Sequence, residues 1–184
     1  TAINLVTAKL YNESPYIEYF DRMFGKKMFI TYQENKINKL TITGMANSIY
    51  HIIKNDLLEG QNEVSGDTIS LSFFNEELSS IRVVGGGIGH FIPELINSSL
   101  DTTINYSGER IHYDIKRSEN YFYKDASITY QDTKLDADYI KVNWDTNKLT
   151  SHIIDNKKPR VKTDSKSEPM EGDTLFYDLV TERG

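Results

Sequence analysis

Histidines and recurring acidic residues are the side chains of this sequence best suited to chemistry. The four histidines lie far apart in the chain, without the close spacing of metal ligands: His51, His90, His112 and His152. Four acidic residues each follow a small residue: Asp67, Glu109, Asp138 and Asp173. Stacked carboxylates of this kind can bind calcium or form the acid pair of a glycosidase, whereas single ones bond nearby turn amides. We expect the second role for the acids, and hydrogen-bonded or solvated histidines.

The other reactive groups lack the partners that catalysis requires. Ser65 and Ser107 have no histidine and aspartate at a fixed local spacing. The glycine run at residues 85–87 has no following lysine of a phosphate-binding loop, so it predicts a β-bulge or close strand packing. The absence of cysteine excludes disulfides, thiol catalysis and thiolate metal sites. We expect no enzymatic activity, no metal and no cofactor.

The elements that position these side chains follow a repeated pattern, in which a corner of small residues precedes a run of alternating apolar and polar residues. A corner at residues 65–67 precedes Ile69, Leu71 and Phe73, which alternate with polar residues as in a half-buried strand. Similar corners, about 30 to 40 residues apart, occur at residues 24–26, 107–109, 136–138 and 171–173. Units of this kind bury their apolar faces by stacking on one another. Because no long segment has a helical period, the sequence predicts an all-β fold of stacked strand repeats.

The repeats also predict how the chain is divided. Residues 42–50 align with residues 83–91, each pairing a glycine-containing corner with a following strand. The segment 93–101 is the best internal break, which predicts one module at 1–97 and a second at 98–184 that continues the stack. The polar segments 55–61 and 155–168 are expected to be surface loops, the second of them mobile. Separate short strands are expected on either side of each corner.

Charge and hydropathy exclude several classes of partner. The chain has 184 residues, with 21 Lys and Arg against 27 Asp and Glu, giving a net charge of −6. This balance excludes the basic stripe of a nucleic-acid-binding protein. No apolar run reaches the roughly 18 residues of a membrane helix. Patterned sequence at both ends predicts a piece of a longer protein.

An ordered set of motifs along the chain resembles the OstA/LptD-like family of lipopolysaccharide-transport proteins. The motifs are NEVSGDTI at 62–69, VVGGG at 83–87, ASITYQD at 126–132, LDADYI at 135–140 and GDTLFYDLVTERG at 172–184. The resemblance implies an elongated periplasmic β-jellyroll, or β-taco, whose two sheets form an open trough. It implies that the trough binds lipopolysaccharide or a similar glycolipid and passes it toward the outer membrane of a Gram-negative type envelope. It further implies that other β-jellyroll modules join by edge-strand addition, and that a missing C-terminal part forms a membrane barrel.

The resemblance places the alternating apolar residues inside the trough, in contact with lipid. These residues are Met28, Ile30, Ile69, Leu71, Phe73, Ile81, Val83, Ile111, Tyr113, Ile140, Val142, Trp144, Leu175 and Tyr177. From their pattern alone they fill a closed core equally well. Two alternatives therefore stay open: a structural or adhesive β-repeat domain that binds protein or glycan through a tyrosine-rich surface, and a β-solenoid enzyme acting on polysaccharide through the acidic corners.

Overall fold

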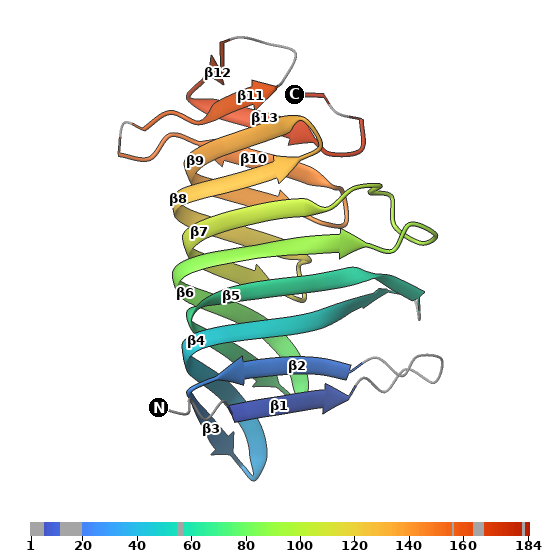
Figure 1. Cartoon of the computed structure of the whole chain (residues 1–184), viewed down its shortest axis with the longest axis vertical. Helices are drawn as coiled ribbons and strands as arrows, with labels where there is room; N and C mark the ends of the chain where they lie inside the picture. Colours follow the sequence, from blue (N-terminus) through green and yellow to red (C-terminus); the bar gives the residue numbers. More distant parts are fainter. Residues whose placement is uncertain (1–5, 12–19, 55–56, 156, 164–167, 182) are drawn as a thin grey trace, which may run out of the picture.

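The chain forms one long antiparallel β-sheet that is folded over on itself (Figure 1). The computed structural model describes residues 6–11, 20–54, 57–155, 157–163, 168–181 and 183–184. The strands in these residues are β1 (Val6–Tyr11), β2 (Phe20–Gly25), β3 (Lys27–Gln33), β4 (Lys36–Lys54), β5 (Leu57–Phe74), β6 (Glu77–Pro93), β7 (Ile104–Asp114), β8 (Glu119–Tyr130), β9 (Thr133–Asn143), β10 (Lys148–His152), β11 (Arg160–Thr163), β12 (Met170–Glu171) and β13 (Thr174–Asp178).

Strands β4 to β9 each run through both layers of the folded sheet. Each bends near its middle, at the left edge in Figure 1, so that one half pairs in the front layer and the other half in the back layer. The pairing register shifts at every bend, for example between Thr43 and Ala46 of β4 and between Val84 and Gly87 of β6. A bulge leaves a residue unpaired and bends the strand. The predicted corners at residues 65–67, 107–109 and 136–138 are therefore bends within continuous strands.

The glycine run of β6 shows why small residues occupy the bends. Gly85 has a φ of +84°, a conformation that residues with a Cβ adopt only at a cost. A Cβ on Gly87 would lie 2.7 Å from the Cδ1 atom of Ile111 in β7, so a larger residue would push the two strands apart. Inside the bend, Ala46, Ala126 and Ala137 are all buried. The two layers can meet at this edge because these positions carry almost no side chain.

The inner face of the back layer consists of two continuous rows of side chains that are mostly apolar. One row pairs across successive strands in the order Leu40, Leu71, Ile81, Tyr113, Asn120, Val142, Leu149 and Tyr177. A second row runs Met28, Ile42, Ile69, Val83, Ile111, Phe122, Ile140, Ser151 and Leu175. Most of these side chains are buried against the front layer. They supply most of the hydrophobic core on this side.

The two ends of the stack differ in how well their inner faces are covered. At the first end β3 pairs only with β4, and Ile30 lies beside buried Leu40 yet is 41% exposed. Tyr32 and Ile37, which pair with each other on the same strands, are exposed as well. At the other end, β11 and β12 extend the front layer and β13 extends the back layer. The first end therefore presents an apolar inner face that no strand of the described chain covers.

Several local expectations need correction. The segment 55–61 is not a loop throughout, because β5 begins at Leu57 and pairs with the end of β4. The segment 155–168 contains β11, which pairs with β9 and buries Val161, so the expectation of a mobile loop is wrong for these residues. Residues 164–167 of that segment lie outside the described residues. The separate strands expected on either side of the corners at residues 65–67, 107–109 and 136–138 are single bent strands, since a bulge bends a strand without ending it. At residues 24–26 and 171–173 the strands on either side are separate, as expected.

The predicted connector at 93–101 is confirmed as a turn between β6 and β7. These two strands nevertheless pair directly, from Ser80 with Asp114 to Phe91 with Ile104, so the sheet continues past the connector. The division into two modules at residue 97 stays a prediction. In the part of the chain that the structure describes, no helix is long and apolar enough to cross a membrane.

Candidate functional site

A cleft of about 260 Å³ opens between the two layers on the side opposite the bends. Its front wall comes from the ends of β4, β5 and β6 and from the connector that follows β6. Its back wall comes from β7, β8 and the turns after β7 and β9. The residues that line it are Tyr50, Ile52, Ile53, Glu59, Asn62, Phe91, Ser98, Ser99, Leu100, Tyr113, Ile115, Ser118, Asn120, Trp144, Asp145 and Asn147.

Aromatic pairs that bridge the two layers form the floor of the cleft. The rings of Tyr50 in the front layer and Tyr113 in the back layer stack with their centroids 6.4 Å apart. Phe91 in the front layer meets Trp144 behind it at 5.9 Å. Aromatic side chains bury large apolar areas and attract one another in offset or tilted arrangements. The interior below the cleft is therefore closed by packing, and the space open to a ligand lies at the rim.

Amide side chains in the walls of the cleft are held in fixed orientations. The Asn62 amide nitrogen donates to the Tyr106 hydroxyl at 2.7 Å, and this hydroxyl donates to the Asn62 carbonyl oxygen at 2.9 Å. The Tyr106 hydroxyl lies over Gly89, where a Cβ would approach it to 2.5 Å. On the back wall, the Trp144 indole donates to the Asn120 carbonyl oxygen at 2.9 Å. Each amide retains hydrogen-bonding capacity that a ligand can use.

A side-chain contact connects the two walls at the rim. The Asn147 amide, in the turn after β9, donates to the Ser99 hydroxyl of the connector at 2.7 Å. Ser98 accepts from the backbone amide of Leu100, whose side chain is buried beside the cleft. This hydrogen bond is exposed to solvent, so water can replace it at small cost. The contact joins the walls without closing the cleft permanently.

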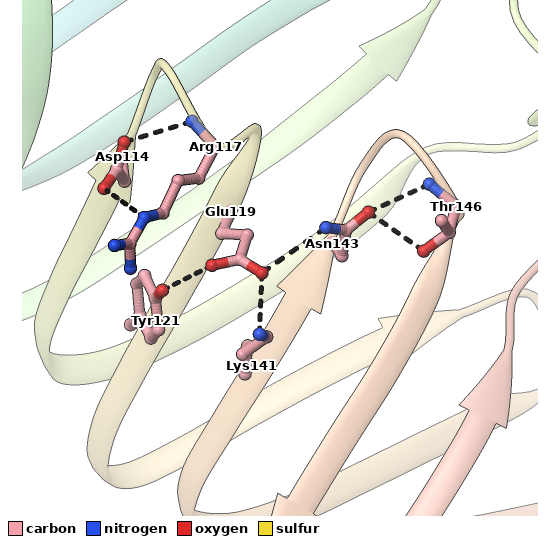
Figure 2. Close-up of polar contacts among 7 residues, drawn as sticks. All are labelled: Asp114, Arg117, Glu119, Tyr121, Lys141, Asn143 and Thr146. Carbon is pink, nitrogen blue, oxygen red and sulfur yellow. Dashed lines mark hydrogen bonds and ion pairs between the residues drawn. The ribbon is translucent and has the colours of Figure 1, made fainter.

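A polar network on the outer surface of the back layer supports the two turns of the back wall (Figure 2). Glu119 accepts hydrogen bonds from Tyr121 and Asn143 and pairs with Lys141 at 2.6 Å. Asn143 in turn accepts from the backbone amide and the hydroxyl of Thr146. The bond from Lys141, followed by that from Tyr121, lowers the pKa of Glu119 to about 2. The ionised network fixes the turn that carries Trp144 and Asp145.

The mouth of the cleft is acidic. Glu59 lines the front wall and Asp145 the back wall, and no described residue of the lining is Lys, Arg or His. Burial of the Tyr113 hydroxyl, followed by the nearby charges of Asp145 and Glu59, raises the pKa of Tyr113 to about 12. Both carboxylates therefore act on the same hydroxyl inside the cleft.

The predicted trough residues all come from one wall. Each belongs to one of the inner rows of the back layer or lies two residues beyond a member of such a row on the same face, as Phe73 and Trp144 do. Only Tyr113 and Trp144 line the cleft. Ile69, Leu71, Ile81, Val83, Ile111, Ile140 and Val142 are buried in the core, whereas Met28, Phe73, Leu175 and Tyr177 are partly buried against it. Contact of these residues with lipid stays a prediction.

The front wall was missed from the sequence, although one signal for it exists. Tyr50, Asn62 and Phe91 occupy neighbouring positions across β4, β5 and β6. The internal alignment of residues 42–50 with 83–91 places Tyr50 opposite Phe91, so these two cleft residues are equivalent positions of the repeat. The polar Asn62 between them interrupts the apolar alternation, so a search for alternating apolar residues does not detect this wall.

Several of the histidines and corner acids take part in local contacts, but the buried Nδ1 atom of His112 has no hydrogen-bond partner among the described residues, contrary to the expectation for the histidines. His51 is bonded to Asp21, with its ring nitrogen 3.1 Å from the carboxylate, and His90 lies 3.3 Å from Glu63. The Asp138 carboxylate accepts from a backbone amide at the neighbouring bend and from Lys157, which confirms a structural role for this acid. Among the described residues, no three His, Cys, Asp or Glu side chains are grouped to hold a metal ion.

Comparison with solved structures identifies a protein of similar fold. LptH from Pseudomonas aeruginosa, described as the LptA homologous periplasmic component of the conserved lipopolysaccharide transport device, superposes with a TM-score of 0.58. The match covers 84% of this chain and 93% of that protein, at 11% sequence identity. No family model matches the sequence, and no curated protein matches it. The likeness shows the fold: an all-β jellyroll trough of the LptA type.

This fold determines what the cleft can do. Its floor offers apolar contact and its walls offer amide and hydroxyl groups, while the outer network keeps the back wall in place. Such a site suits a ligand with an apolar chain and a polar, hydroxyl-bearing end.

Proposed function

We propose that this chain is a periplasmic β-jellyroll module that binds lipopolysaccharide or a similar glycolipid and passes it toward the outer membrane. The observation that supports this most directly is the rim cleft, where aromatic side chains from both layers form an apolar floor beneath ordered amides. The fold shared with a periplasmic component of a lipopolysaccharide transport device supports the same function.

An acyl chain has physical reasons to enter this cleft. Each buried methylene stabilises the bound state by about 0.8 kcal/mol. The rings of Tyr50, Phe91 and Trp144 provide the apolar surface, and Asn62 and Asn120 lie where sugar hydroxyls at the head of the lipid can bond. Binding needs no covalent step and no cofactor. The cleft is open at the rim, so the lipid can both enter and leave there.

Transfer requires a neighbouring module, and the first end of the stack offers a place for one. The exposed inner-face residues Ile30, Tyr32 and Ile37 extend the apolar face of the trough to this end. The edge of β3 that faces away from β4 has no partner strand among the described residues. A second β-jellyroll can add a strand to such an edge and continue the trough. In this arrangement the neighbouring modules are the protein partners.

Photo-crosslinking tests the proposal. A photoreactive residue replaces Ile115, which lines the cleft, and a matched control replaces Lys116, the exposed next residue of the same turn. We expect capture of lipopolysaccharide at Ile115 and little capture at Lys116. Circular dichroism verifies that both variants fold. Equal capture at the two positions, or none at Ile115 in folded protein with lipid present, would refute binding in the cleft.

A second candidate function rests on the outer surface of the back layer. Tyr123 packs against Tyr139 at 5.5 Å, Tyr139 packs against His152 at 4.4 Å, and Arg110 lies over the Tyr123 ring. A row of aromatic rings on the outer surface of the sheet offers faces on which sugar rings can stack. This surface favours the adhesive alternative, in which the domain binds glycan. Loss of glycan binding on Tyr139→Ala, with lipid capture at Ile115 unchanged, would establish this second function.

A further inference from the structure

Two neighbouring rows of side chains on the outer face of the back layer contain no acidic residue. One row pairs across successive strands in the order Phe29, Thr41, Ser70, Arg82, His112, Tyr121, Lys141, Thr150 and Phe176. The other runs Lys27, Thr43, Thr68, Val84, Arg110, Tyr123 and Tyr139, and His152 packs on Tyr139. We call these two rows the outer band. The chain as a whole has a net charge of −6, so this band differs in charge from the rest of the surface.

Two arginines give the outer band its positive charge. Arg82 and Arg110 are both exposed, and neither forms an ion pair with an acidic side chain in the part of the chain that the structure describes. Lys141 differs from them, because it pairs with Glu119 of the next row at 2.6 Å (Figure 2). The band therefore presents two positive charges to solvent, on the neighbouring strands β6 and β7.

Aromatic rings lie beside both arginines. The guanidinium group of Arg110 lies 5.2 Å from the centroid of the Tyr123 ring. Arg82 pairs across the strands with His112, whose ring stacks on Tyr121 with the centroids 5.9 Å apart. Ring faces offer apolar contact to a sugar ring, and a guanidinium group can bind a carboxylate through two parallel hydrogen bonds. The band thus combines both kinds of contact at two adjacent places.

The aromatic and basic part of the outer band is long. It extends from β6 to β10, which are neighbours in the sheet in chain order. Adjacent strands are about 4.8 Å apart, so this part measures about 19 Å. Hydroxyl side chains continue the band beyond it, for example Thr68 and Ser70 on β5. An extended chain of several sugars fits this length, and its hydroxyl groups can bond those of the band.

We infer that the outer band binds an acidic glycan, in which sugar rings stack on the aromatic side chains and carboxylates pair with Arg82 and Arg110. This inference rests on the second candidate function, glycan binding at this surface, and specifies its ligand class. The arginines are diagonal neighbours on adjacent strands, a position that places backbones about 7–8 Å apart. A nucleic-acid strand carries one charge per about 3.4 Å, so the wider spacing suits a glycan with a carboxylate on every second sugar.

Two forms of one oligosaccharide test the role of charge directly. A hyaluronan hexasaccharide carries a carboxylate on every second sugar, and its methyl ester is the same chain without charge. Each is labelled at one end and titrated with the protein while fluorescence anisotropy is followed. We expect the acidic form to bind about fivefold more tightly, because two exposed ion pairs contribute modestly. Added salt should narrow this ratio, because it screens the two charges. A thymidine hexanucleotide should bind less tightly than the acidic form.

A charge-removing variant and a matched control localise the effect. Arg82→Gln with Arg110→Gln should bring the ratio of the two dissociation constants to about one. Lys134→Gln with Lys162→Gln removes the same charge from two exposed, paired residues on the outer face of the front layer and should leave the ratio unchanged. Tyr139→Ala should weaken both forms alike, because stacking does not depend on the carboxylate. Circular dichroism verifies folding, and if the arginine variant does not fold, the salt dependence of the unchanged protein decides.

The outcomes separate this inference from the earlier proposals. Equal binding of the two hyaluronan forms, or a ratio insensitive to salt, would overturn the preference for an acidic glycan and leave the second candidate function in place. A ratio that falls as much in the lysine control would overturn the assignment to the outer band, and tighter binding of the hexanucleotide would overturn the choice of a glycan. Binding of neither form by folded protein would overturn both this inference and the second candidate function, whereas lipid capture at Ile115 decides the lipid-binding proposal independently.

Discussion

Removing the Tyr106 hydroxyl should destabilise the fold measurably through one buried neighbour. This hydroxyl both accepts from and donates to the Asn62 amide, and Asn62 is only 4% exposed. In Tyr106→Phe the amide loses both hydrogen bonds, and an unsatisfied buried polar group costs about 1–3 kcal/mol. Because Asn62 also lines the cleft, water can reach part of it, so we expect about 2 kcal/mol. For a chain of this length this corresponds to a fall in Tm of about 4–8 °C.

A double-mutant cycle tests whether the loss of stability in Tyr106→Phe arises from the unsatisfied Asn62 amide. Asn62→Leu preserves the approximate shape of the side chain and removes the group that needs the hydroxyl. In the Asn62→Leu background, Tyr106→Phe should cost less than about 0.5 kcal/mol, because no polar partner is left unsatisfied. Urea unfolding followed by circular dichroism gives the four free energies of unfolding. An equal cost of Tyr106→Phe in both backgrounds would show that the hydroxyl acts elsewhere and would refute the argument.

Three further perturbations test other parts of the structure. Glu119 has a pKa lowered from 4.5 to about 2, so its contribution to stability is present above pH about 4.5 and is lost as the pH falls toward about 2. Glu119→Gln should lower the Tm at neutral pH and flatten its dependence on pH in that window. Val161→Asp should cost about 3 kcal/mol or more, measured by urea unfolding, because Val161 is buried where β11 meets β9; no loss would mean that β11 is not docked. Gly87→Leu should lower the Tm by forcing β6 from β7 beside Ile111, whereas Val84→Leu, at an exposed position of the same strand, should leave it nearly unchanged.

The sequence predicted the class of fold because alternation is a local property. Ile69, Leu71 and Phe73 alternate over a few residues, and a strand needs no distant information to show this pattern. The positions of the bends were predictable for the same reason, since glycine and alanine at a recurring corner mark backbone bends and close approach. The continuity of a strand through a bend was not predictable from these residues, because a bulge and a strand end use the same small residues.

Local polarity misled the prediction for residues 155–168. The sequence 155–168 is rich in Lys, Asp and Ser, as mobile loops are, yet Val161 is buried by β9. Lys157, nearby, bridges Asp125 and Asp138 at a bend of the sheet. The partners of both side chains lie more than 15 residues away in the chain. A strand of four residues depends on such distant contacts more than on its own composition.

The candidate site illustrates why a one-dimensional pattern shows one wall of a trough more easily than two. Each bent strand contributes its two halves to opposite walls. The alternation of inward and outward side chains continues from one half to the other, so inward residues such as Tyr50 and Phe91 lie in the front wall, and Leu71 and Tyr113 lie in the back wall. A core wall tolerates little but apolar residues, whereas the wall beside a ligand retains polar groups such as Asn62. A binding function is therefore expected at the wall with the weaker apolar pattern. In the amino-acid sequence this wall is identified by Tyr50 and Phe91, which occupy equivalent positions of the internal repeat.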